Sequence, residues 1–430
     1  MQIIELIEAT GAKVLAEVDK DLDVKISTDT RTIQKGDFYL PLKGASFDGE
    51  KFINQAFEKG AIGAFCTGDN GTLQVKDTLT AYLQLANYRR KKLNFTVVAI
   101  TGSSGKTTTK ELAASVLSEK FRTFKTPLNH NNEIGFCQTI FEAPDDTEIL
   151  VLEMGMRGLG EIELLSKYAE PDITIISNVG TAHIGRLGSR ENIAKAKCEI
   201  VKYQRGNIFI AHDDELIKKT VQFSGKKIFY SIKDVKILEK DTHYSKFEYY
   251  GNIYELNVGG DYNIENALSA INTGLTLGMK VDEIQSGLKK YAPIEKRWEA
   301  VNAGGFEIIN DSYNANPESM RAFIDTIFEL YEKPVVILGD MGELGEDEIK
   351  YHSELGKYIN SHKNLRQDAE ILSIGKLSKY ITDGVTNCPA KHFETIEQAA
   401  AYLKNKDTKV QLFLKASRSM KFERIIEELK

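Results

Sequence analysis

Short apolar runs alternate with helix-like stretches along most of the chain. The clearest run, Phe95 to Ile100, is apolar and rich in β-branched residues, which is typical of a parallel strand covered on both faces. Similar runs cover residues 149–155 and 172–177, and two shorter ones lie within 207–230. From residue 296 onward, strand-like and helical stretches alternate regularly. This pattern predicts an α/β fold built on mainly parallel sheets.

The length of the chain predicts several domains, because 430 residues are too many for one core. We place the boundaries near residues 88 and 295. Residues 1–88 combine helical patterning from Ile3 to Ala16 with short strands, which indicates a small α/β domain. Residues 89–295 form a central domain that contains the Phe95–Ile100 strand and ends after a β-hairpin near 244–257. Residues 296–430 are predicted to be a Rossmann-like, doubly wound domain, with strands at 307–310, 334–338, 370–374 and 410–415.

Composition narrows the class of protein. The 42% hydrophobic and 27% charged residues are ordinary for a soluble globular protein, and the net charge of −6 argues against a nucleic-acid binder. The N-terminus lacks a basic signal-peptide region, and no apolar run is long enough to span a membrane. The four cysteines are scattered, which fits a reducing compartment and excludes a cysteine-rich zinc module. We therefore expect a cytoplasmic protein without a membrane span or a nucleic-acid partner.

A glycine-rich turn follows the Phe95–Ile100 strand and opens a helix. In the segment Gly102-Ser-Ser-Gly105-Lys106-Thr107, the glycines let backbone amides approach a phosphate. Lys106 can reach the β- and γ-phosphates, and the Thr107 hydroxyl can bind Mg²⁺. The usual phosphate-binding loop (P-loop) has another glycine where Ile100 stands, so this loop is a shortened variant. The alternative is a plain Gly/Ser turn with a lysine in solvent.

Two polar residues lie at the ends of predicted strands. Glu153 ends the run that begins at Ile149, and His183 follows the run over 172–177. Ligands of open α/β sheets bind at the carboxyl ends of the strands, so both side chains are candidates for binding Mg²⁺. Alternatively, Glu153 caps a helix N-terminus and His183 is structural.

Lys197 has an unusual position on the helix predicted from Glu191 to Tyr203. At 100° per residue it falls within the apolar face, whereas Lys195 and Lys202 fall on the polar side. This position on a helical wheel (the wheel) alone favours a lysine whose stem is buried and whose ammonium reaches water. The other interpretation is a buried, neutral amine that takes up CO₂ to form a carbamate, which could bind a cation.

Several polar loops complete the set of candidate sites. The segment 126–135 carries three asparagines and a glycine, and 310–317 and 339–345 follow two strands that end at the same edge. Asn263 and Asn266 open a helix, where they either read a base edge or cap the helix. Arg31 and the segment 47–49 either hold an anion or form a plain turn.

Taken together, these motifs resemble the Mur ligases, the ATP-dependent amide-forming enzymes of peptidoglycan precursor synthesis. The resemblance covers nearly the whole chain, and the segment 101–108 matches the family's short P-loop. Four stretches are most similar to the branch that joins D-alanyl-D-alanine to UDP-N-acetylmuramoyl-tripeptide (UDP-MurNAc-tripeptide): 106–111, 129–135, 311–320 and 339–345. The Asp-Asn-Pro-Arg motif expected of the enzyme that adds meso-diaminopimelate is absent from the sequence.

The resemblance implies ATP, two Mg²⁺ ions and a carbamylated Lys197 as the cofactors. It implies catalytic roles for Lys106, His183 and Lys197 and a metal shell of Thr107, Glu153, His183 and Lys197. The residues implied to bind ATP are Gly102, Ser103, Ser104, Gly105, Lys106, Thr107, Thr108, Asn263, Asn266, Arg297 and Asp311.

The resemblance also implies a substrate site distributed over all three domains. The N-terminal domain would bind the nucleotide-sugar, the central domain ATP, and the C-terminal domain the incoming dipeptide. The substrate-binding residues implied are Thr30, Arg31, Phe47, Asp48, Gly49, Asn129, Asn131, Asn132, Asn316, Pro317 and Ser319.

The sequence departs from the family pattern at three positions. Tyr262 replaces a histidine, Cys137 stands where a proline is common, and Ala416 replaces a glycine. Two other functions compete with the main interpretation: a ligase similar to folylpolyglutamate synthase, and a P-loop regulatory ATPase that joins no molecules. We expect a monomer, and the third residue of the tripeptide, lysine or diaminopimelate, is not predicted.

Overall fold

The computed structural model describes residues 1–44, 47–127, 130–294, 296–406 and 410–430. Contacts divide the chain into two compact units. Unit 1 comprises Met1–Thr96, Thr126–Glu148 and Lys167–Ala169, and unit 2 comprises the remaining residues, including both large sheets. The predicted α/β class with mainly parallel sheets is confirmed, and the three-domain division at residues 88 and 295 stays a prediction.

Unit 1 contains a small five-stranded sheet with the order β1-β5-β4-β3-β2. Its inner strands pair in parallel, and β1 pairs antiparallel with β5 at the edge. The helix predicted from Ile3 to Ala16 ends at Thr10, because Gly11 adopts the left-handed conformation that terminates it. The elements are α1 (Ile3–Thr10), β1 (Lys13–Val14), β2 (Ile26–Ser27), β3 (Phe38–Tyr39), η1 (Gly49–Phe52), α2 (Ile53–Glu58), β4 (Gly63–Cys66), β5 (Leu73–Gln74), α3 (Thr78–Leu93) and α5 (Glu133–Glu142).

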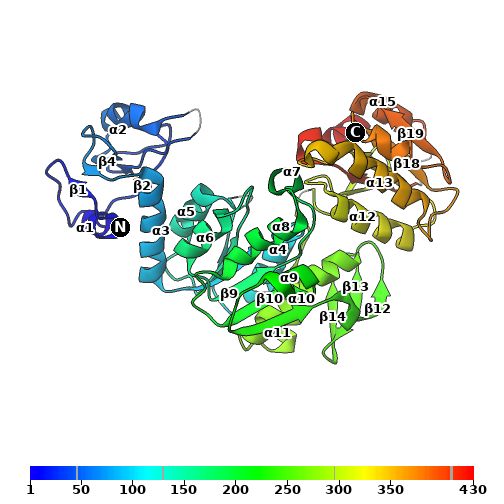
Figure 1. Cartoon of the computed structure of the whole chain (residues 1–430), viewed down its shortest axis with the longest axis horizontal. Coiled ribbons are helices and arrows are strands. Elements are labelled where there is room, and N and C mark those ends of the chain that lie inside the picture. Colours follow the sequence, from blue (N-terminus) through cyan, green and yellow to red (C-terminus); the bar gives the residue numbers. More distant parts are fainter. Residues whose placement is uncertain (45–46, 128–129, 295, 407–409) are drawn as a thin grey trace. The chain divides into compact units, whose positions relative to one another are not determined.

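The first large sheet has six strands in the order β11-β10-β9-β6-β8-β7 (Figure 1, cyan to green). The pairs β11–β10, β10–β9, β9–β6 and β8–β7 are parallel, as the apolar runs predict. The strands are β6 (Thr96–Thr101), β7 (Thr123–Lys125), β8 (Ile149–Glu153), β9 (Ile173–Ile176), β10 (Ile208–His212) and β11 (Lys226–Tyr230). The helices are α4 (Lys106–Leu117), α6 (Glu161–Ala169), α7 (Ile184–Leu187), α8 (Arg190–Cys198), η2 (Glu199–Val201), α9 (Glu215–Thr220), η3 (Ile232–Asp234), α10 (Asp261–Thr276) and α11 (Val281–Lys290).

A three-stranded antiparallel sheet follows β11. It contains the predicted hairpin, β13 (Ser245–Tyr249) and β14 (Asn252–Leu256), together with β12 (Lys236–Lys240).

The second large sheet has the order β15-β16-β20-β17-β18-β19 (Figure 1, yellow to red). All pairs are parallel except β15 with β16. Both edge strands, β15 and β19, are additions to the predicted set. The strands are β15 (Glu299–Ala303), β16 (Phe306–Asn310), β17 (Val335–Gly339), β18 (Glu370–Ile374), β19 (Ala390–Phe393) and β20 (Leu412–Lys415). The helices are α12 (Pro317–Leu330), η4 (Gly345–Asp347), α13 (Glu348–Asn360), α14 (Lys379–Thr382), α15 (Ile396–Leu403), η5 (Arg418–Met420) and α16 (Glu423–Leu429).

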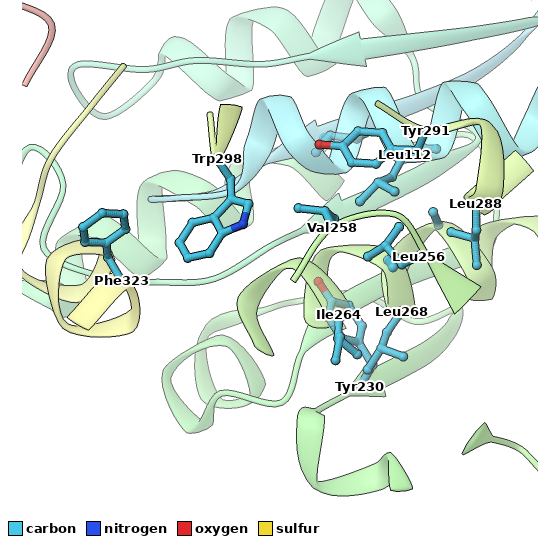
Figure 2. Packing of buried hydrophobic residues seen from close by; sticks show 14 of the residues in the cluster. Leu112, Tyr230, Leu256, Val258, Ile264, Leu268, Leu288, Tyr291, Trp298 and Phe323 are labelled. Atoms are coloured by element: carbon cyan, nitrogen blue, oxygen red, sulfur yellow. The ribbon is translucent and has the colours of Figure 1, made fainter. Parts of the chain in front are cut away.

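One cluster of buried apolar side chains in unit 2 joins residues on both sides of position 295. Trp298 is part of it, as Figure 2 shows, and its ring packs edge-on against Tyr262 and Phe323 with centroid distances of 5.7 Å each. The Trp298 indole N–H donates to the carbonyl of Thr242 at 2.9 Å. The segment after residue 295 is therefore anchored by packing as well as by chain connectivity. No helix in the described part of the chain is long and apolar enough to cross a membrane.

Candidate active site

The P-loop is the turn between β6 and α4, and the end of β9 holds it in place. The backbone amides of Ser103 and Ser104 donate to the carbonyl and side-chain oxygens of Asn178, at 3.1 and 2.9 Å. The Ser177 hydroxyl donates to the Ser104 carbonyl at 2.5 Å. Gly105 enters α4 with a φ of 76°, in the left-handed region. The segment after β9 thus fixes the shape of the loop before any nucleotide binds.

Lys106 is the first residue of α4, and it is half-buried rather than extended into solvent. Its ammonium donates to the carbonyl of Gly102 at 2.8 Å. Burial lowers the pKa of Lys106, the Glu153 carboxylate opposes this effect, and the Arg297 guanidinium adds to it. The structure therefore brings three of the predicted site residues into one electrostatic environment.

Glu153 and Thr107 provide oxygen donors at the end of the sheet. Glu153 is the last residue of β8 and Thr107 lies in the first turn of α4, and both are buried. Among the described residues, no group of three or more His, Cys, Asp or Glu forms a metal cluster. Mg²⁺ in nucleotide sites typically takes one or two carboxylates and completes its shell with phosphate oxygens and water. One buried carboxylate and one hydroxyl fit a cation that arrives with a nucleotide.

Lys197 is fully buried, with 1% of its surface exposed, whereas Lys195 and Lys202 are exposed. The wheel-based interpretation of an ammonium reaching water is therefore wrong. A wheel gives the direction of a side chain but not the thickness of the structure that covers it. Burial holds the pKa of Lys197 well below its usual range, and the positive charge of Lys106 acts in the same direction. Its amine forms neither a hydrogen bond nor an ion pair with any described residue.

His183 precedes α7 with its backbone in the left-handed region, at a φ of 67°. Its Nδ1 atom lies 2.6 Å from a carboxylate oxygen of Glu343, in the loop after β17. The nearby His183 imidazole lowers the pKa of the Glu343 carboxyl group. The predicted metal ligand is thus engaged by a residue to which the sequence assigned no role.

Asn316 and Ser319 form the start of α12. The Asn316 side chain accepts from the backbone amide of Ser319, and the Ser319 hydroxyl accepts from that of Asn316, which makes a capping box with Pro317 in the first turn. The Asn316 amide also donates to the hydroxyl of the P-loop residue Ser104 at 2.9 Å. These residues, which are predicted to bind substrate, therefore lie beside the P-loop.

Asn263 and Asn266 are both buried in α10. The Asn263 amide donates to the Gly259 carbonyl at 2.7 Å. The capping alternative is wrong, because Gly260 is the N-cap of α10 and no side chain caps this helix. The Asn266 oxygen accepts from the Thr109 hydroxyl at 3.2 Å and faces Gly105 closely. Asn266 therefore supports the P-loop from behind.

Arg297 and Asp311 lie at the start of the segment that follows residue 295. The Arg297 guanidinium stacks on the Tyr313 ring at 3.9 Å. Asp311 pairs with the Lys415 ammonium at 2.5 Å and accepts from the Trp298 amide at 3.2 Å. Burial raises the pKa of Tyr262, the residue that departs from the family pattern, well above its usual range, and the Asp311 charge adds to this. Thr108, the remaining residue predicted to bind ATP, is buried in α4.

The predicted nucleotide-sugar residues lie in unit 1, where most of them have structural partners. The Thr30 hydroxyl donates to Gln55, and the exposed Arg31 pairs with Asp29. Asp48 caps η1 by accepting from the amide of Glu50. The exposed ring of Phe47 stacks on Phe52, and Gly49 lies so close to Leu42 that a side chain would clash there. The turn alternative thus describes the local structure, and binding stays a prediction.

The asparagine loop also belongs to unit 1. Asn132 caps α5, because its side-chain oxygen accepts from the amide of Gly135 at 2.9 Å. Asn131 precedes it, and Asn129 lies outside the described residues. The substrate roles of all three asparagines stay predictions.

Sequence reasoning missed four residues that the structure places at this site. Asn178 shapes the P-loop, and Glu343 contacts His183. Glu318 accepts from the amide and hydroxyl of Thr181, and the buried Lys110 lies beside Glu153. Their partners are 43 to 160 positions away in the chain, so no local pattern marks them.

Two family models match the chain over most of unit 2. The Mur ligase middle domain matches residues 100–274, and the Mur ligase, glutamate ligase domain matches residues 296–418. A P-loop, a carboxylate at a strand end and a buried lysine lie within the first of these matches. The chain belongs to the Mur ligase family.

Within this family the similarity is to one branch. UDP-N-acetylmuramoyl-tripeptide–D-alanyl-D-alanine ligase of Bacillus subtilis is 37% identical over 94% of this chain and 92% of its own length. A crystal structure of MurF from Acinetobacter baumannii matches with a TM-score of 0.89 and 28% identity, covering 100% of this chain and 98% of that one. MurF ligase from Thermotoga maritima in complex with ADP matches with a TM-score of 0.83 and 28% identity, covering 94% and 96%.

Proposed function

We propose that this protein is an ATP-dependent ligase that joins D-alanyl-D-alanine to UDP-MurNAc-tripeptide and so forms the UDP-MurNAc-pentapeptide of peptidoglycan synthesis. The observation that carries the proposal is the 37% identity, over nearly both full lengths, to a relative named for this activity. The electrostatic effect of Glu153 on the pKa of Lys106, and of Lys106 on the pKa of the buried Lys197, supports it. We propose a cytoplasmic location, which the scattered cysteines fit, and a monomeric state.

We further propose that each of three domains binds a different substrate. Residues 1–88 bind the nucleotide-sugar, 89–295 bind ATP, and 296–430 bind the dipeptide. The matched ranges of the two family models, which meet between residues 274 and 296, support the second boundary.

A carboxylate does not react directly with an amine, because its oxygen is a poor leaving group, so it must first be activated. Transfer of the γ-phosphoryl group of ATP to the carboxylate of the tripeptide gives an acyl phosphate, and attack by the amine of D-alanyl-D-alanine then expels phosphate. Lys106 and the P-loop amides stabilise the charge on the phosphoryl group during transfer. Thr107 and Glu153 would hold one Mg²⁺, and His183 and the modified Lys197 would hold a second; when bound, these ions would neutralise charge and orient the reacting oxygens.

Lys197 fits the second cation position only after modification. An ammonium would repel a cation, but a neutral amine adds CO₂ and loses a proton to give a carbamate anion. Complete burial and a strongly lowered pKa favour the neutral amine, which supports this proposal.

The first experiment measures phosphate release from ATP and Mg²⁺ with either the lysine or the diaminopimelate tripeptide, with and without D-alanyl-D-alanine. We expect release only when both substrates are present, together with a pentapeptide product identified by its mass. The tripeptide that supports the higher rate then identifies the third residue. Release with a folate substrate would favour a folylpolyglutamate synthase-like ligase, and release independent of any acceptor would favour a regulatory ATPase.

Closure of the C-terminal domain over the site is a further part of the proposal, and Glu318 allows a test. Its carboxylate accepts from the Thr181 amide at 3.0 Å and hydroxyl at 2.7 Å, across the proposed boundary. A hydrogen bond to a charged group contributes about 1.5–3 kcal/mol, so we expect Glu318→Ala to lower the ligation rate about tenfold or more. Small-angle scattering should show a smaller compaction with ATP analogue and substrate than in the unchanged protein.

The matched control for Glu318→Ala is Glu346→Ala, because Glu346 is exposed and forms no hydrogen bond or ion pair with the described residues. Its rate should remain unchanged. Scattering profiles that are identical with and without ligands in the unchanged protein would contradict closure.

A further inference from the structure

A second lysine of α4 lies beside the candidate cation carboxylate. Lys110 is one helical turn beyond Lys106, so both side chains lie on the same side of the helix. The Lys110 ammonium is 3.9 Å from an oxygen of Glu153, and both side chains are almost completely buried. The positive charge of a lysine this close opposes that of a cation bound to Glu153. Lys110 therefore affects the charge that a cation meets at Glu153.

Lys110 is also held from its other side. Its ammonium lies 3.2 Å from an oxygen of Glu111, and Glu111 pairs in turn with Lys125 on β7. The Lys125 side chain is 44% exposed, whereas that of Glu111 is 13% exposed. Alternating charges thus run from the surface to Glu153, and Glu111 and Glu153 share the charge of Lys110.

We propose that Lys110 is a charge-balancing residue that offsets the negative charge of Glu153. As a result, the site binds a divalent cation together with nucleotide phosphates and does not bind the free ion. The proposal rests on the proposed function for the presence of a nucleotide-bound cation. The charges of two lysines, Lys106 and Lys110, therefore act at Glu153, and entering phosphates would bring the negative charge that offsets them. A bare cation is therefore disfavoured, and the cation and ATP bind cooperatively.

The test titrates nucleotide-free protein with Mn²⁺ and follows the free ion by electron paramagnetic resonance. Lys110→Met keeps the length of the stem and removes the charge, so we expect it to bind free Mn²⁺ at least about tenfold more tightly than the unchanged protein. In Glu111→Gln, Glu153 is the remaining one of the two carboxylates beside Lys110, so more of the Lys110 charge acts on Glu153. We therefore expect this variant to bind free Mn²⁺ more weakly than the unchanged protein. Adding Glu153→Gln to Lys110→Met should remove the gain.

The opposite signs separate charge balance from a purely structural ion pair, which would lower stability in both variants without raising Mn²⁺ affinity. Mn²⁺ binding to Lys110→Met within threefold of the unchanged protein would overturn the proposal. If Lys110→Met fails to fold, as monitored by circular dichroism, unchanged or tighter Mn²⁺ binding by Glu111→Gln overturns it. Because no tripeptide or dipeptide is present, this result is independent of whether the protein proves to be a ligase.

Discussion

Replacing Lys197 with alanine is expected to abolish ligation while ATP still binds. Loss of a single charged group that acts on the transition state typically costs a factor of 10²–10³, so we expect turnover to fall by at least about a hundredfold. Lys197 is 1% exposed, and the positive charge of Lys106 helps to lower its pKa. ATP affinity, measured by calorimetry, should change by less than about threefold, because Lys106 and the P-loop remain.

Two variants separate the chemistry of Lys197 from its packing. Lys197→Met keeps most of the buried stem, so a protein that folds normally but does not ligate would exclude a packing defect. Lys195→Ala, on the exposed face of the same helix, should turn over normally. In ¹³C NMR with labelled bicarbonate, the unchanged protein should give a carbamate signal that Lys197→Met lacks. Near-normal turnover of either Lys197 variant would end the carbamate proposal.

Positions along strands and helices could be predicted from the sequence because they depend on local pattern. The apolar run before Gly102 predicted β6, Glu153 is the last residue of β8, and His183 follows β9, as expected. Both polar loops of the second sheet follow parallel strands, β16 and β17, and so share one edge. The wheel also placed Lys197 on the apolar face of its helix correctly.

What surrounds each of these positions could not be predicted, because it depends on distant segments. Whether Lys197 reaches water is decided by the elements that cover α8, which a wheel does not contain. Glu343 lies 160 positions from His183, and the aspartates and glutamates of its loop look alike in sequence. The edge strands β15 and β19 were missed because their residues are largely exposed, so they lack an apolar run.

A methyl group added at Gly105 is expected to damage the nucleotide site and the fold together. Gly105 has a φ of 76°, where an L-residue costs about 1–2 kcal/mol. The new Cβ would also lie 2.4 Å from the side-chain oxygen of Asn266, which is held by the Thr109 hydroxyl. Relief of this clash must move the P-loop, α10 or the Asn266 side chain, and the last of these breaks the hydrogen bond with Thr109. We therefore expect Gly105→Ala to lower the free energy of unfolding by about 2–4 kcal/mol and ATP affinity by more than about tenfold.

Gly160 is the matched control, because it precedes α6 as Gly105 precedes α4 and has a similar φ of 85°. A Cβ at Gly160 would meet nothing within 4 Å, so Gly160→Ala carries the backbone cost without the clash. Its free energy of unfolding should fall by only about 1–2 kcal/mol, with unchanged ATP affinity. Denaturant unfolding and calorimetric titration measure both quantities. If the two variants are equally destabilised and bind ATP equally well, the Asn266 side chain moves aside at little cost. Asn266 then does not hold the P-loop in the shape that binds ATP.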